Sequence, residues 1–168
     1  PEQAAEAVAA ALAEGFAPDS IGEAVTLAAN QLLLRDAGRP PEQSQANKPP
    51  GSVHGDSIGV HACDSANAWR NMARISSARN QAACLMLGAW QVSHDRTSRG
   101  GDFLNWQPWP LAEHAEKLAA DKSAQSAEGL MSVLNTSIRG NDQATACAAV
   151  QLLAKTDHSP RAIFDVLL

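Results

Sequence analysis

The side chains best suited to chemistry gather in one stretch, residues 51–74, which reads GSVHGDSIGVHACDSANAWRNMAR. This stretch contains two of the five His residues, a Cys, two Asp, two Asn and two Arg. Imidazole, thiolate and carboxylate groups bind metal ions and take part in acid–base chemistry. A functional site is therefore expected in this stretch before any other part of the chain.

The candidate metal ligands are His54, His61, Asp64 and His94. If residues 54–74 form a helix, His54 and His61 lie two turns apart, about 10.5 Å along the axis. That separation is too large for both to bind one ion from a straight helix. Asp64 follows His61 by one turn, which suits a shared metal ion or a His–Asp hydrogen bond. His61 with Asp64 is therefore the favoured pair, and the alternative for each His is a hydrogen-bonded structural imidazole.

A polar stripe on the same predicted helix provides the candidate ligand-binding residues, which are Asn67, Arg70, Asn71 and Arg74. Beside it, Gly55, Gly59 and Cys63 recur at every fourth position, and small residues at that spacing let another helix or a ligand approach closely. Because Trp69 and Met72 on this helix must pack, some of its polar groups are expected to be buried. Buried polar groups need partners from a structural network, a ligand or a metal.

The segment Gly55–Gly59, GDSIG, resembles the Gly-Asp-Ser turns of chymotrypsin-like and GDSL-type hydrolases. That resemblance implies a nucleophilic Ser57 on a β-barrel or a strand-to-helix elbow. The sequence shows neither context, so Asp56 or Ser57 is better interpreted as the N-cap of the helix. Cys63, close in sequence to His61, offers a Cys–His nucleophile as a further hydrolase alternative.

The elements around this stretch predict an all-α fold, either a helical bundle or a helical-repeat-like domain, with about seven or eight helices and two long loops. The long loops are expected at 37–53, which is rich in Pro, Gln and Asn, and at 94–110. The helices are expected at about 2–14, 18–35, 54–74, from the Ser76–Ser77 break to 92 or 93, 111–120, 122–138, 142–155 and 160–168.

A weak internal echo links residues 1–25 and 141–168. Each reads as a capped Ala-rich helix, a short break near a Pro and a second amphipathic helix. Paired helices of this kind stack in α-solenoids. Ala-rich composition alone also produces the similarity, so the repeat interpretation and the compositional one both stay open.

Composition limits the classes of partner. Charged residues make up 18% of the chain, below the usual quarter or so, so part of the surface is expected to pack against other protein chains or the remainder of a longer chain. The net charge of −5 and the lack of basic runs argue against nucleic acid. No apolar run is long enough for a transmembrane helix. The three Cys, with no CxxC, argue against a disulfide framework or a zinc ribbon.

Two functional hypotheses follow for what is expected to be a single helical domain over residues 1–168, with ends that look cut from a longer chain. The first, which we favour, is a helical binding or assembly module built around the central polar helix. The second is a metal- or haem-dependent all-α enzyme, with oxidoreductases among the options. Its site would lie at His54, His61 and Asp64, and its cofactor would be a divalent metal or haem.

Overall fold

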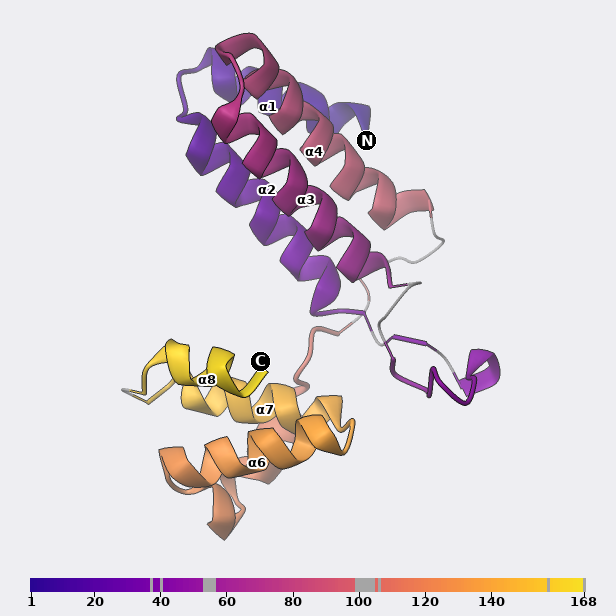
Figure 1. Cartoon of the computed structure of the whole chain (residues 1–168), viewed down its shortest axis with the longest axis vertical. Coiled ribbons are helices and arrows are strands. Elements are labelled where there is room, and N and C mark those ends of the chain that lie inside the picture. Colours follow the sequence, from indigo (N-terminus) through magenta and orange to yellow (C-terminus); the bar gives the residue numbers. More distant parts are fainter. Residues whose placement is uncertain are drawn as a thin grey trace. The chain divides into compact units, whose positions relative to one another are not determined.

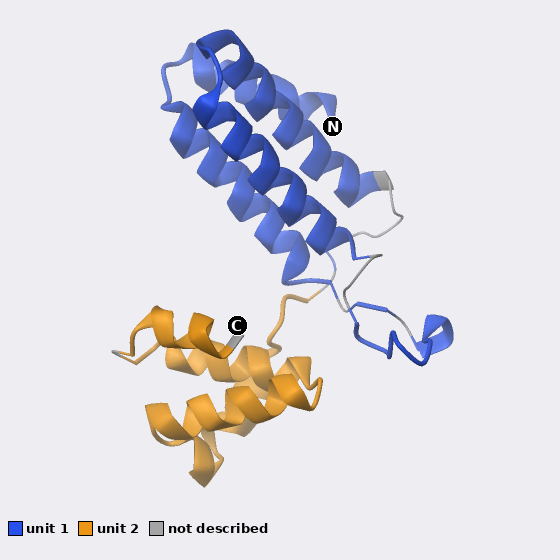
Figure 2. Cartoon of the chain, in the orientation of Figure 1, with its two compact units in different colours: residues 1–106 blue, residues 107–168 orange. Residues whose placement is uncertain are grey.

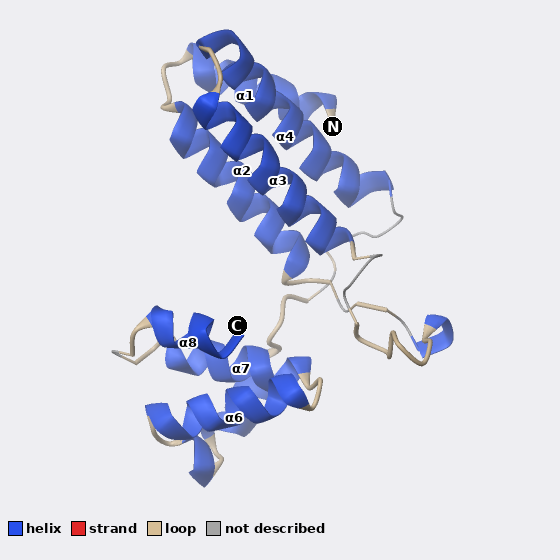
Figure 3. Cartoon of the chain, in the orientation of Figure 1, coloured by secondary structure: helices blue, strands red, loops and turns tan. Residues whose placement is uncertain are grey.

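The computed structural model describes residues 1–36, 38–39, 41–52, 57–98, 105, 107–156 and 158–167. These residues contain eight α-helices and no strand, which confirms the predicted all-α fold (Figure 3). The chain divides into two compact units, residues 1–106 and 107–168 (Figure 2). The prediction of a single domain stays a prediction.

The first unit is a four-helix bundle (Figure 1). Helices α2, α3 and α4 all pack against one another, whereas α1 packs mainly against α4 and hardly touches α2. The bundle is therefore tight on one side and open between α1 and α2. Its helices are α1 (Glu2–Ala13), α2 (Pro18–Leu33), α3 (Ile58–Ile75) and α4 (Ala78–Ser98).

The turn between α1 and α2 follows from local sequence. Gly15 has a φ of +93° and ends α1. The amide of Gly15 donates to the Leu12 carbonyl, and that of Phe16 donates to the Ala11 carbonyl, each at 3.1 Å. This is the double hydrogen bond of a glycine-terminated helix. Pro18 then occupies the first turn of α2, where its missing N–H is not needed.

Small residues allow α2 and α3 to come very close. A Cβ placed on Gly59 would lie 2.4 Å from the Cα of Leu33, so only glycine fits at this position. Ala29, Ala62 and Ala66 are buried in the same contact. The predicted role of Gly59 in close helix packing is confirmed.

One predicted boundary in this unit was wrong. Helix α3 is described from Ile58 onward, and residues 53–56, on which its predicted start falls, lie outside the described part. Helix α4 continues to Ser98 instead of ending near residue 93. The added part of the helix carries Asp95, which accepts from the Gln91 side chain at 3.0 Å, and His94, which stacks on Trp90 one turn earlier. The first breaker after Ser93 is Gly100, so nothing in the sequence stops the helix before then.

The loop after α2 is closed at its base. The amide of Arg39 donates to the Ser52 carbonyl and the amide of Gly51 donates to the Arg39 carbonyl, both at 2.9 Å. A short 3₁₀ helix, η1 (Pro41–Gln43), and a pair of backbone hydrogen bonds between Gln45 and Lys48 lie within it. The described residues of the predicted long loop, 38–39 and 41–52, are therefore held together by hydrogen bonds of their own backbone.

The second unit has its own core, in which Leu134 and Leu153 are fully buried. The predicted helix over 122–138 is divided, because Asp121 caps η2 (Lys122–Ala124) and Ser126 caps a new helix. The predicted cap at Asp142 is confirmed, since its carboxylate accepts from the Thr145 amide at 3.0 Å. The helices are α5 (Ala112–Ala119), α6 (Ala127–Arg139), α7 (Gln143–Leu153) and α8 (Pro160–Leu167).

Of the helices described in either unit, none has the length and apolar character needed to cross a membrane.

Candidate functional site

The predicted metal ligands do not form a recognisable ion site. Asp64 is exposed and His61 half-buried on α3, while His94 stacks on Trp90 with ring centroids 4.8 Å apart. His54 lies outside the described residues. Within the part of the chain that the structure describes, no three His, Cys, Asp or Glu side chains are grouped so that they could hold a metal ion. The metal or haem hypothesis stays a prediction.

The predicted ligand-binding stripe on α3 lies at the surface. Asn67, Asn71 and Arg74 are exposed, and the Asn71 amide donates to the Asn67 side-chain oxygen at 3.3 Å. Arg74 forms an ion pair of 3.0 Å with Asp19 at the start of α2, and Arg70 lies 3.7 Å from the same carboxylate. These two Arg side chains thus help to fix α3 against α2.

The polar groups that were expected to be buried on this helix are not those of Asn67, Asn71 and Arg74, which are exposed. Met72, which we expected to pack, is 49% exposed. The buried face of α3 consists of small residues, whose short side chains allow close packing against α2 and α4 without burying the polar ones. These buried residues are Gly59, Ala62, Ala66 and Ala73.

The buried polar groups of this region come from a different pair, Asp36 and Ser57, which are 6% and 5% exposed. The Asp36 carboxylate accepts from the backbone amides of Gly38 and Gly59 and from the Ser57 hydroxyl. The Ser57 oxygen also accepts from the Val60 amide, so Ser57 is the N-cap of α3, as predicted. The Ser57 hydroxyl group donates to the Asp36 carboxylate and accepts from the backbone of its own helix. These hydrogen bonds give Ser57 a structural role.

Sequence reasoning missed Asp36, although its place just after α2 was a usable signal. A short polar side chain between a helix end and a Gly can accept hydrogen bonds from nearby backbone amides. Its partner 21 residues later was not readable from local sequence. Only the folded chain brings Ser57 and Gly59 to this carboxylate.

Cys63 is held in a setting unsuited to a nucleophile. Its thiol donates to the side-chain oxygen of Asn30 on α2 at 3.3 Å. Burial, and next the negative charge of Asp64, raise the pKa of the Cys63 thiol. Reactive cysteines need a lowered pKa, because the thiolate is the nucleophile.

In the second unit, His114 has a clear structural role. The backbone amide of Leu111 donates to Nδ1 of His114 at 3.3 Å, and the imidazole stacks on Trp109 with centroids 5.1 Å apart. This arrangement closes the first turn of α5.

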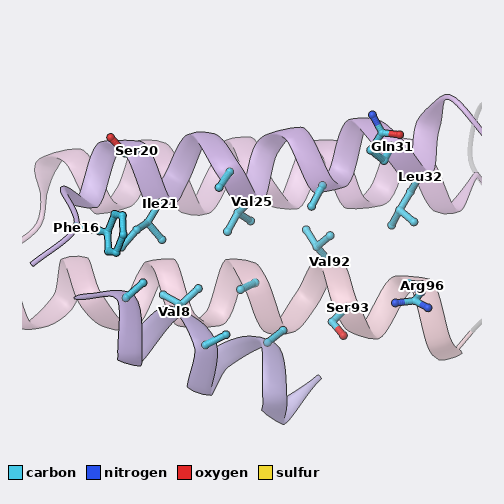
Figure 4. A pocket seen from close by; sticks show the side chains of 16 residues that line it. Val8, Phe16, Ser20, Ile21, Val25, Gln31, Leu32, Val92, Ser93 and Arg96 are labelled. Atoms are coloured by element: carbon cyan, nitrogen blue, oxygen red, sulfur yellow. The ribbon is translucent and has the colours of Figure 1, made fainter. Parts of the chain in front are cut away.

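The main concave feature that the structure adds is an apolar groove of about 690 Å³ in the first unit (Figure 4). We call it the α1/α2 groove. It lies where α1 and α2 diverge over α4, and six of its sixteen lining residues are alanines. Its lining residues are Ala4, Ala7, Val8, Ala11, Phe16, Ser20, Ile21, Ala24, Val25, Ala28, Gln31, Leu32, Ala89, Val92, Ser93 and Arg96.

The two ends of the α1/α2 groove differ in chemistry. Phe16 lies at one end and is 59% exposed, while Gln31, Ser93 and Arg96 lie at the other (Figure 4). Between them the groove is open to solvent, because the alanines on its rim are exposed. The site is an apolar trough with one polar, cationic end. The rim alanines are Ala7, Ala24 and Ala28.

No signal in our sequence reading pointed to this groove, because its alanines were interpreted only as helix formers. Comparisons with known proteins do not add a function, since no protein-family model, curated protein or solved structure matches the chain. The functional inference therefore rests on the chemistry of the α1/α2 groove.

Proposed function

We propose that this protein is a non-catalytic helical docking module that binds an amphipathic helix of another protein chain in the α1/α2 groove. The observation that supports the proposal is the open apolar trough of about 690 Å³ between α1, α2 and α4. Volumes and apolar linings of this kind are typical of binding sites, and exposed apolar patches mark interaction surfaces. This proposal belongs to the same functional class as the hypothesis favoured from the sequence, which is a binding or assembly module.

The shape of the groove favours a helix as the occupant. A helix with one apolar and one polar face would bury the first against α4 and keep the second in water, as an open trough requires. From Ser20 to Leu32 the wall formed by α2 runs for about 18 Å at the standard helical rise. That length matches three to four turns of a bound helix.

The alanine lining provides the space for side-chain anchors. Large apolar side chains of a partner helix can enter between short alanine side chains, with helix axes about 8–10 Å apart. Each Leu, Ile or Phe that becomes buried contributes about 1.5–3 kcal/mol. Three or four anchors would together contribute about 4.5–12 kcal/mol, against an association cost that begins at about 4 kcal/mol. Micromolar binding is then the tight end of the expected range.

The proposal can be tested with a synthetic peptide of about 18 residues, long enough to cover the groove at the helical rise. The peptide carries Leu at i, i+4, i+7 and i+11 and polar residues elsewhere, and fluorescence anisotropy measures its binding. Ala28→Glu should weaken binding at least about tenfold, because it places a charge in the apolar trough. Ala28 is exposed, so this variant is expected to fold.

The matched control is Ala68→Glu, the same substitution at an exposed alanine on α3 outside the groove. This variant should bind like the wild type. A peptide of the same composition with its leucines spread around the helix should not bind. Equal binding to the two variants, or binding of the Leu-stripe peptide no tighter than that of the spread one, would contradict the docking role.

A further inference from the structure

We propose that the α1/α2 groove selects partner helices that carry an acidic residue at one end of their apolar stripe, and that Arg96 recognises this carboxylate. This inference rests on the proposed function and adds the chemistry of the partner. It makes Arg96 the specificity-determining residue of the docking site.

Among the described residues that line the groove, Arg96 is the one with a charged side chain. It lies in the last turns of α4 and is exposed, at the end of the groove opposite Phe16 (Figure 4). None of the acidic side chains that the structure describes forms an ion pair with it. Asp95, its neighbour in sequence, is buried and accepts a hydrogen bond from Gln91 instead. The guanidinium of Arg96 is therefore available to a partner.

The other polar groups at this end are also oriented as donors. The side-chain oxygen of Gln31 accepts from Arg35 at 2.5 Å, which leaves the Gln31 amide nitrogen to donate to a partner. Arg35 also brings a second positive charge close to the same end. The hydroxyl of Ser93 can donate as well. An anionic oxygen complements this set of groups, whereas a Lys or Arg of a partner would meet the like charges of Arg96 and Arg35.

The negative net charge of the chain makes the local positive charge of Arg96 significant for the choice of partner. At −5 the protein as a whole repels acidic partners. A positive end on an otherwise apolar groove therefore selects for one carboxylate at one place instead of attracting anions in general. Apolar contacts combined with one charged contact determine where along the groove a bound helix lies.

The test uses peptides that share one Leu stripe and differ by a single residue. One matched pair carries Glu or Lys in the last turn, and a second pair carries Glu or Lys in the first turn, so that either orientation in the groove is covered. Binding is measured by anisotropy at low salt to wild type, to Arg96→Glu and to Arg79→Glu. Arg79 is exposed on the same helix outside the groove, so the control makes the same change in net charge.

With the wild type, the Glu peptide of one pair should bind about two- to fivefold more tightly than its Lys counterpart, the range for an exposed ion pair. Arg96→Glu should reverse that order, and Arg79→Glu should leave it unchanged. If both members of each pair bind the wild type equally, or if the order survives in Arg96→Glu, the role of Arg96 is overturned while docking stands. If no Leu-stripe peptide binds, the docking function itself fails.

Discussion

Ser57 and Asp36 form a buried hydrogen bond that joins the start of α3 to the end of α2. The Ser57 hydroxyl donates to Asp36 Oδ2 at 2.5 Å, across 21 residues of sequence. The same oxygen accepts from the Gly59 amide, while the other carboxylate oxygen accepts from Gly38. One carboxylate thus fixes both ends of the long loop between these helices.

Replacing Ser57 by Ala should destabilise the first unit by about 1–3 kcal/mol, because it removes the α3 cap and leaves Asp36 without one of its donors. Urea unfolding followed by circular dichroism measures this change. Ser44→Ala removes an exposed hydroxyl from the loop and should change the stability by less than about 0.5 kcal/mol. Equal stability of the two variants would show that the buried bond contributes nothing.

The same geometry predicts that Ser57 does not react with a fluorophosphonate probe. Its hydroxyl is 5% exposed and already bonded to Asp36 and to the backbone of its own helix. Mass spectrometry after incubation should find the peptide that contains Ser57 unmodified. Stoichiometric labelling at Ser57 would support the hydrolase alternative instead.

Gly59→Ala should lower the stability of the α2–α3 contact by about 1–3 kcal/mol, the usual effect of overpacking. The added Cβ would lie 2.4 Å from the Cα of Leu33, which is backbone and cannot rotate away. In an unobstructed helix the same change stabilises by about 0.5–1 kcal/mol. Whether Gly59→Ala lowers or raises the stability therefore shows directly whether α2 and α3 are in close contact at this position.

Thermal unfolding distinguishes these outcomes. Gly140→Ala is a suitable control, because its φ of −84° suits alanine and the nearest obstructing atom is 3.3 Å away. A midpoint for Gly59→Ala that is equal to or above that of the wild type would mean that α2 and α3 are not in tight contact.

Cys63 should react slowly with a thiol reagent at neutral pH and faster as pH rises. Burial and the nearby Asp64 raise its pKa, so the reactive thiolate is scarce near pH 7. Asp64→Asn should increase the rate at a given pH, because it removes the second of these causes. Rates measured with a chromogenic disulfide between pH 7 and 10 test both statements.

The same raised pKa fixes the sign of a pH effect on stability. A thiol whose pKa is higher in the folded protein contributes its full stabilisation at pH values below its unfolded pKa. This stabilisation is lost as pH rises through the folded pKa. Cys63→Ser should therefore reduce the alkaline loss of stability. Cys147, whose pKa is raised by burial alone, should show no dependence on Asp64. A Cys63 rate that is unaffected by Asp64→Asn would exclude the proposed electrostatic cause.

The sequence by itself determined the helices and most of their ends. Alanine propensity, apolar spacing and caps such as Gly15 and Asp142 act within a few residues, so they can be read locally. The end of α4 was misplaced because it was set at the last apolar position, Val92, although the helix continues to Ser98 and no breaker precedes Gly100.

Only the tertiary structure decided which faces are buried and where a partner could bind. Some polar groups of α3 were expected in the interior, yet Gly59 and the alanines beside it occupy that position because only small side chains fit between helices so close together. The α1/α2 groove exists because α1 packs on α4 and diverges from α2. An alanine at Ala28 is as good a helix former in a groove as on a plain surface, so helix propensity could not reveal it.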